Sequence, residues 1–202
     1  MRFCFLLINL IAVIILPINA QPVHPIEQKT ESLLEKLYHT DALKQTQQID
    51  QRLLWLSKIN LNKPYILFPL GEGLTGVYDQ QPRFRLDGFD CGTFVSTQLA
   101  LALSDNPQTF KRCINKIRYH SKRVCYVGRN HFTSIDWNLS NQRLGVLDDI
   151  TREITGDKGQ VIYKTANGII DKSNWYKHTS IERIKLFETT RSEAKARAHA
   201  LK

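Results

Sequence analysis

Residues 87–103 read Asp-Gly-Phe-Asp-Cys-Gly-Thr-Phe-Val-Ser-Thr-Gln-Leu-Ala-Leu-Ala-Leu, the most apolar helical pattern of the chain after its N-terminus. Asp90 precedes the pattern and can cap a helix, while Ser104 and the following residues up to Pro107 close it. A helix that is apolar around its whole circumference is buried in a protein core. The sequence therefore predicts a buried helix over residues 91–103 that begins at Cys91.

Cys91 lies where an irregular loop turns into this helix. The first amides of a helix have no intrahelical partner, and the helix dipole is positive at that end. Both effects favour a thiolate, and the same amides can bind the oxyanion of an acyl-transfer intermediate. Gly92 leaves room for a substrate carbonyl beside the backbone. From the spacing alone, a catalytic nucleophile and an inert structural cysteine both stay open as interpretations of Cys91.

Apolar spacing predicts further elements on both sides of this helix. Helices are expected over residues 26–39, from about residue 41 to 59, and over 107–118, and extended segments over 66–70, 123–127, 146–154 and 160–163. The inner face of the 41–59 helix is predicted to carry Ile49, Leu53, Leu54 and Leu56. The chain ends in a polar helical tail, residues 188–202, which we expect to pack weakly.

Residues 1–20 have the pattern of a secretory signal peptide. Arg2 is followed by an apolar run from Phe3 to Pro17, and Ala20 is a small residue at the expected cleavage point. The apolar run is shorter than the roughly 20 residues that span a bilayer. We therefore expect a periplasmic or secreted protein without a stable membrane anchor, and an uncleaved anchor is the alternative interpretation.

The formal net charge of +9 bears on the partners of the chain. The basic residues are scattered and form no stripe interleaved with aromatic residues, so we expect no nucleic-acid partner. Outside the cytosol the available polyanions are cell-wall and envelope polymers, towards which a basic surface is steered. A solvated basic surface without a dedicated binding site is the simpler interpretation.

Three cysteines remain once Cys4 is removed with the signal peptide: Cys91, Cys113 and Cys125. An oxidising compartment favours pairing, and an odd number leaves one thiol over. Cys113 and Cys125 flank a predicted helix-to-strand turn, so we expect them to form a disulfide. Cys91 would then be the single free thiol of the protein.

The motif Asp-Cys-x-x-Phe at residues 90–94 resembles the nucleophile motif of the NlpC-type cell-wall peptidases and amidases, a branch of the papain-like cysteine hydrolases. Further motifs agree in order with one subfamily, described as N-acetylmuramoyl-L-alanine amidase-like and formerly a domain of unknown function. These motifs are Lys63-Pro-Tyr65, Leu70-Gly-Glu-Gly73, Ile117-Arg-Tyr119, and Arg129-Asn-His-Phe132 followed by Asp136-Trp137-Asn138. The resemblance covers roughly residues 60–150.

The resemblance implies an α+β fold with a papain-like NlpC-type core. It implies N-terminal helices, a buried helix that starts at the Cys91 nucleophile, and a small antiparallel sheet that is incomplete at the C-terminus. The chain would divide into a signal peptide (1–20), an N-terminal helical region (21–59), an amidase-like domain (60–187) and the polar tail (188–202).

The implied activity is hydrolysis of the bond between N-acetylmuramic acid and L-alanine in peptidoglycan fragments, the expected partners. No cofactor is implied, and no Cys/His spacing in the chain matches a zinc site. The sequence does not reveal the oligomeric state. Two alternatives stay open: a catalytically incomplete remnant that at most binds cell-wall fragments, and a basic envelope protein in which Cys91 is structural.

The catalytic base is the point at which the chain departs from the family pattern. Family members carry the catalytic histidine in a late His-Val-Gly-like stretch, whereas His178 and His199, the histidines after residue 150, lie in no such stretch. We therefore expect either that the chain stops before the last strands of the fold or that another histidine serves. His131, near Asp136, is the best internal substitute.

Binding of substrate is the role that we expect for His131 and its neighbours. Arg129 can grip a carboxylate or a sugar by paired hydrogen bonds, which makes a binding site the preferred interpretation of this motif. We assign Arg129, Asp136 and Trp137 to substrate binding, although core packing explains Trp137 equally well. His131 is accordingly predicted to bind substrate rather than to act as the base.

Overall fold

The computed structural model describes residues 22–120, 123–154 and 159–160. Its elements are α1 (Pro25–Tyr38), α2 (Asp41–Gln45), α3 (Ile49–Ile59), α4 (Cys91–Ala102), α5 (Pro107–Arg118), the 3-10 helix η1 (Tyr126–Gly128), the π-helix η2 (Thr133–Trp137) and α6 (Asn138–Arg143). Within the described ranges, none of the helices combines the length and the apolar character needed to cross a bilayer.

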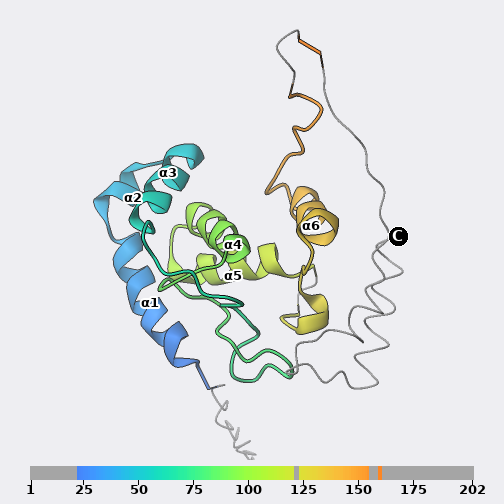
Figure 1. The fold of residues 1–202 in the computed structure, drawn as a ribbon. Helices are drawn as coiled ribbons and strands as arrows, with labels where there is room; N and C mark the ends of the chain where they lie inside the picture. The colour runs from blue at the N-terminus through green and yellow to red at the C-terminus, as the bar shows by residue number, and fades with distance from the viewer. Residues whose placement is uncertain (1–21, 121–122, 155–158, 161–202) are drawn as a thin grey trace, which may run out of the picture.

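Helix α4 lies at the centre of the fold, where it packs against α3 on one side and α5 on the other, while α1 contacts α5 (Figure 1). The helix begins at Cys91 as predicted, but it is buried at one end only. Ala100 and Leu101 are fully buried, whereas Cys91 and Val95 are exposed. The core formed around its buried end contains Leu34, Tyr38, Leu43, Leu56, Phe84, Leu86, Phe89, Ala100, Leu101, Ala102, Phe110, Ile114 and Ile117.

Local capping fixes where α4 begins. The amide of Thr93 donates to the Asp90 carboxylate at 2.7 Å, and the Thr93 hydroxyl accepts from the Asp90 amide at 3.0 Å. Asn106 and Thr109 make the same reciprocal pair at the start of α5. Because an N-cap of this kind stabilises a helix by about 1 kcal/mol, the first residue of each helix is set by neighbours three positions apart.

The predicted helix over residues 41–59 is wrong in one respect, because the chain forms two helices, α2 and α3, with a break at residues 46–48. Leu56 is fully buried as predicted, but Ile49 and Leu54 are exposed. The backbone is extended at Thr46, which ends α2. Ile49, Leu54 and Leu56 all lie on α3, so which of them are buried depends on the face of this one helix that packs against α4.

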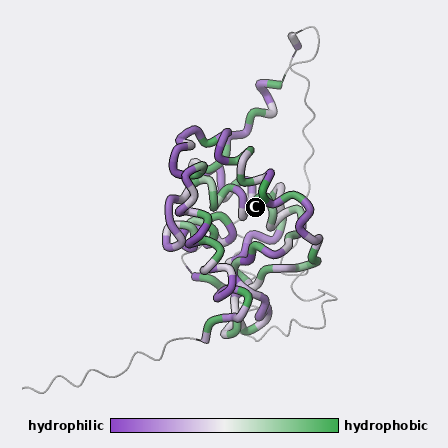
Figure 2. The backbone as a smooth tube through the Cα atoms, turned by 90° about the vertical axis from the view of Figure 1, so that its left-hand side faces the viewer, coloured by the Kyte–Doolittle hydropathy of each residue, from purple (hydrophilic) through white to green (hydrophobic). Residues whose placement is uncertain are grey.

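The structure contradicts two of the predicted extended segments and interrupts a third, residues 66–70, with a bend at Leu67 and Phe68. Residues 123–127 lead into the 3-10 helix η1, and at residues 150–154 the Ile150 carbonyl accepts from the amides of Glu153 and Ile154 in a turn. The segment after α6 leaves the helical body in Figure 1, and Figure 2 shows hydrophobic and hydrophilic residues mixed along it. Neither segment has a neighbouring strand in the described part of the chain, and an extended pattern without a pairing partner gains little from the β conformation.

Strand pairing among the described residues is limited to isolated bridges, a parallel one between Tyr65 and Phe89 and an antiparallel one between Tyr119 and Arg129. The expected small antiparallel sheet and the papain-like core therefore stay predictions. The signal peptide (1–20), nearly all of the segment 160–163 and the tail (188–202) lie outside the described residues.

The predicted disulfide is also wrong, because Cys113 and Cys125 are both free thiols in the structure. Cys113 lies on α5 and packs against the core, where burial raises the pKa of its thiol. Cys125 directly precedes η1. The packing of α5, rather than the spacing of the two cysteines, decides where Cys113 points.

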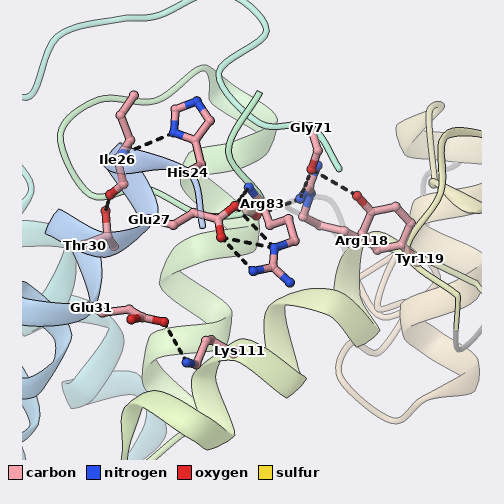
Figure 3. A network of polar contacts seen from close by, with 10 residues as sticks. All are labelled: His24, Ile26, Glu27, Thr30, Glu31, Gly71, Arg83, Lys111, Arg118 and Tyr119. Atoms are coloured by element: carbon pink, nitrogen blue, oxygen red, sulfur yellow. Dashed lines mark hydrogen bonds and ion pairs between the residues drawn. The ribbon is translucent and has the colours of Figure 1, made fainter. Parts of the chain in front are cut away.

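A buried ion pair attaches α1 to the irregular chain before α4. The Glu27 carboxylate is on a residue only 1% exposed and accepts from the Arg83 amide at 2.6 Å and from the Arg83 guanidinium at 2.7 Å. Figure 3 shows this pair and a separate contact of α1, this one with α5, in which Lys111 donates to Glu31 at 2.8 Å. A buried carboxylate needs such partners, since burial of an unpaired charge is costly.

We predict that Glu27→Ala lowers the free energy of unfolding by about 2–3 kcal/mol, because it removes a buried charged acceptor from the amide and the guanidinium of Arg83. Glu31→Ala is the matched control on the same helix, and its partly exposed pair should contribute less than about 1 kcal/mol. Urea unfolding of both variants measures the difference. Equal losses would show that the Glu27 contacts do not hold α1 in place.

Candidate active site

Cys91 opens the candidate site as the first residue of α4. Its thiol is free and exposed, and it lies on a cavity of about 1490 Å³. The amides of Cys91 and Gly92 are the first two of the helix, where no intrahelical acceptor exists. A Cβ placed on Gly92 would meet only a carboxylate oxygen of Asp90, at 3.8 Å. The backbone beside the sulfur is therefore open to a ligand.

Several distant parts of the chain contribute side chains to this cavity. Its polar and charged lining includes His24, Asp79, Asp90, Arg118, Arg129, Asn130 and His131, and its apolar and aromatic lining includes Ile66, Leu67, Phe68, Val77, Tyr78, Val95, Tyr126 and Trp137. Four of the predicted site residues thus share one cavity: Cys91, Arg129, His131 and Trp137. Among the described residues, no group of three or more His, Cys, Asp or Glu side chains is placed to hold a metal ion.

The ring of His131 is held by Tyr126. Its Nε2 lies 2.7 Å from the Tyr126 carbonyl oxygen, and the two ring centroids are 4.5 Å apart. Since a carbonyl only accepts, Nε2 carries a proton and the lone pair of the neutral ring is on Nδ1. No hydrogen bond joins His131 to Cys91 among the described residues. The assignment of His131 to binding or to base catalysis stays a prediction.

Asp136 lies beneath the cavity rather than on its wall, and it is 2% exposed. Its carboxylate accepts from the backbone amides of His131 at 3.1 Å and Phe132 at 2.7 Å, at the start of η2. Asp136 therefore fixes the backbone that carries His131. Its assignment to substrate binding stays a prediction.

Arg129 is engaged by two carboxylates of the protein. Its Nε donates to Glu72 at 3.0 Å and its Nη2 to Asp79 at 2.9 Å, while the guanidinium lies over the Tyr126 ring. Burial by itself would lower the pKa of Arg129, but the adjacent Glu72, with Tyr119 and Asp79 in support, raises it instead. The paired hydrogen bonds expected for a substrate carboxylate are thus made to Glu72.

The family-like motifs meet in one polar network around Gly71 and Glu72. The Tyr119 hydroxyl donates to Glu72 at 3.2 Å and to the Gly71 carbonyl at 3.3 Å. Arg118 donates to the Gly71 and Arg83 carbonyls, and Figure 3 shows Arg118 and Tyr119 converging on Gly71. Motifs more than 40 positions apart in the sequence therefore form a single structural unit at the base of the cavity.

Sequence reasoning missed His24, Phe68 and Asp79 as cavity residues. His24 caps α1, where its Nδ1 accepts from the Ile26 amide at 3.1 Å, so this nitrogen carries no proton. Nothing in the pattern of residues 22–26 signals proximity to Cys91, because the two lie far apart in the sequence. Asp79 had no sequence signal either, because its pairing with Arg129 joins residues 50 positions apart.

A free, exposed cysteine at the start of a core helix, on a cavity that also holds histidines and aromatic side chains, defines a candidate cysteine hydrolase site. A family model described as N-acetylmuramoyl-L-alanine amidase-like, or AmiA-like, matches residues 55–196. The chain belongs to this family.

Two crystal structures resemble the chain. A Legionella pneumophila protein, strain Philadelphia 1, is 42% identical with a TM-score of 0.74, and the match covers 87% of this chain and 58% of that one. An N-acetylmuramoyl-L-alanine amidase from Bacteroides uniformis is 22% identical with a TM-score of 0.56, and the match covers 76% and 61% of the two chains. The second likeness concerns the fold alone. No protein of curated function matches the sequence.

We predict opposite pH dependences for two carboxylates near the site. Burial raises the pKa of Glu72 above its ordinary 4.5, although Arg129 opposes the shift. A raised carboxyl pKa contributes stability at low pH that is lost as the pH rises through the folded-state pKa. The stability of the parent relative to Glu72→Gln should therefore fall as the pH rises above about 4.5.

Asp87 provides the control, because hydrogen bonds from Arg85 at 2.6 and 2.8 Å lower the pKa of its carboxyl. Its contribution is present at neutral pH and is lost as the pH falls, so the stability of the parent relative to Asp87→Asn should rise with pH. Urea unfolding at several pH values measures both trends. Two trends of the same sign would contradict the assigned environments.

Proposed function

We propose that this protein is a cysteine amidase of peptidoglycan fragments that cleaves the bond between N-acetylmuramic acid and L-alanine. The observation that carries the proposal is the position of Cys91, an exposed thiol at the start of α4 on a large cavity. Membership of the N-acetylmuramoyl-L-alanine amidase-like family supplies the substrate class. The proposal includes a papain-like NlpC-type core with a small antiparallel sheet, and export to the periplasm or beyond.

The size of the cavity supports a substrate larger than a single sugar. Its volume of about 1490 Å³ exceeds the roughly 300–1,000 Å³ of ordinary small-molecule sites. The lining combines aromatic and aliphatic side chains with charged ones, which suits a ligand with a sugar at one end and a peptide at the other. Trp137 and Arg129 border this space.

In the proposed reaction the Cys91 thiolate attacks the carbonyl carbon of the muramoyl lactyl group. The amides of Cys91 and Gly92 are placed to donate to the oxyanion that forms. The carbon–nitrogen bond then breaks, and the L-alanine nitrogen takes up the proton that the thiol gave up. Water hydrolyses the resulting thioester, which releases the muramoyl carboxylate and restores the thiol.

For His131 we propose a binding role. Its Nε2 proton is committed to the Tyr126 carbonyl, and Asp136, the carboxylate expected to orient a base, accepts from the His131 amide instead. A catalytic base needs a lone pair within about 3 Å of the thiol proton, directly or through one water. No hydrogen bond joins His131 to Cys91 among the described residues.

Replacement of the nucleophile is the first test. We predict that Cys91→Ala lowers the release of stem peptide from anhydro-muramoyl peptides by about 10⁴-fold or more, without a change in circular dichroism. Cys125→Ala is the matched control, since Cys125 does not line the cavity, and it should keep parental activity. Chromatography of the released peptide measures the rate.

Two results would count against the cysteine mechanism. Activity of Cys91→Ala equal to that of the parent would exclude Cys91 as the nucleophile. An inactive parent that still binds muramoyl peptides would instead identify a protein that binds wall fragments without cleaving them.

The kinetic constants of a His131 variant distinguish a binding role from a role as catalytic base. We predict that His131→Ala raises KM about tenfold and leaves kcat within a few-fold, because a binding contact is lost while the attack on the carbonyl is kept. Loss of a general base would instead lower kcat by about 10²–10⁴-fold. His120→Ala serves as the control, because His120 lies outside the cavity and contacts the Gly128 carbonyl.

A further inference from the structure

Phe68 has an unfavourable backbone conformation beside the candidate nucleophile. Its φ of +50° lies in the left-handed region, which bulky residues rarely adopt. The side chain is 60% exposed, so burial of the ring in the core does not compensate for the strain. Phe68 lines the same cavity as Cys91. Strain of this kind in an exposed residue is typical of a site where the side chain has a function.

The chain on both sides of Phe68 is held in place. Upstream, the Ile66 amide donates to the Phe89 carbonyl at 3.0 Å, and the Phe89 amide donates to the Pro64 carbonyl at 3.1 Å. Downstream, the Gly71 amide donates to the Pro82 carbonyl at 2.9 Å. Phe89 stands two positions before Cys91, so these bonds fix the backbone around Phe68 relative to the thiol.

Gly88 makes the upstream contact possible. A Cβ at this position would lie 2.7 Å from the Pro64 carbonyl oxygen and 2.5 Å from the Ile66 side chain. Only a glycine therefore permits the approach of the two segments. The backbone conformation of Phe68 is thus constrained by contacts on each side of it.

Three further apolar side chains are exposed around the same space: Leu67, Val77 and Val95. Val95 follows Cys91 by one turn of α4, on the same face of the helix. These residues and Phe68 are the exposed, uncharged apolar side chains that line the cavity, and together they are called the apolar rim. The cations of the cavity, Arg118 and Arg129, come from a different part of the chain.

We infer that the apolar rim binds the sugar end of the substrate and that Phe68 determines specificity for it. The ring stacks on the C–H face of the muramoyl pyranose, and Leu67, Val77 and Val95 contact its acetyl and lactyl methyl groups. The stem peptide carries free carboxylates, which the uncharged rim cannot pair. This inference rests on the proposed amidase function.

The test separates strain from binding through Phe68→Gly and Phe68→Tyr. Glycine adopts a positive φ without strain and removes the ring, whereas tyrosine keeps both the strain and an aromatic ring. The two changes are made in Cys91→Ala protein, so that bound fragments are not cleaved. Calorimetry or ligand-observed NMR then measures the affinity for two probes, the methylamide of N-acetylmuramic acid and the stem dipeptide L-Ala-γ-D-Glu.

We expect Phe68→Gly to weaken sugar binding about tenfold, to leave dipeptide binding unchanged, and to keep or raise the melting temperature. Phe68→Tyr should bind the sugar as tightly as the Cys91→Ala parent. Loss of dipeptide binding alone, unchanged binding of both probes, or a lower melting temperature for Phe68→Gly would each overturn the inference.

The proposed function fails by a different result. The parent protein is tested for cleavage of muramoyl peptides, and the Cys91→Ala variant is tested for binding of the two probes. If the parent does not cleave and the variant binds neither probe, both the amidase proposal and the inference are wrong. If the parent cleaves muramoyl peptides and Phe68→Gly cleaves them with an unchanged kcat/KM, only the inference is lost.

Discussion

The guanidinium of Arg129 is held between the carboxylates of Glu72 and Asp79, and the arrangement of the cavity depends on this contact. Buried charges are tolerated only with partners, so the segment around residues 71–79 and the segment around residues 126–131 must meet. Tyr119 adds a hydroxyl to Glu72 from the end of α5. The network therefore joins the two segments that contribute Asp79 and Arg129 to the lining of the cavity.

Helix α4 combines two environments that a nucleophile needs. Its C-terminal half is buried among the core side chains, which fixes the helix, and its first turn opens onto the cavity. A reactive group on such an element is placed more precisely than one on a loop. The cap from Asp90 to Thr93 then determines that Cys91 is the first helical residue, beside unpaired amides.

The lining of the cavity that contains Cys91 includes both apolar and polar side chains. Aliphatic and aromatic side chains of residues 66–70, together with Val77 and Val95, line it along with polar groups from Arg118, Arg129 and His131. A substrate that is part sugar and part peptide also combines apolar and polar groups. Residues 64–90 connect α3 to α4 and also supply part of the cavity lining. This segment is attached to α1 by the hydrogen bonds between Arg83 and Glu27.

The sequence by itself determined the features that depend on near neighbours. The starts of α4 and α5 follow from caps three positions long, and Cys91 stood out because a helix begins there. Tertiary structure decided the rest: the free Cys113 on the packed α5, the 3-10 helix at Tyr126 in place of a strand, and the engagement of Arg129 by carboxylates 50 and 57 positions away. A cap is satisfied within one turn, whereas a strand and a buried charge require partners that only the folded chain supplies.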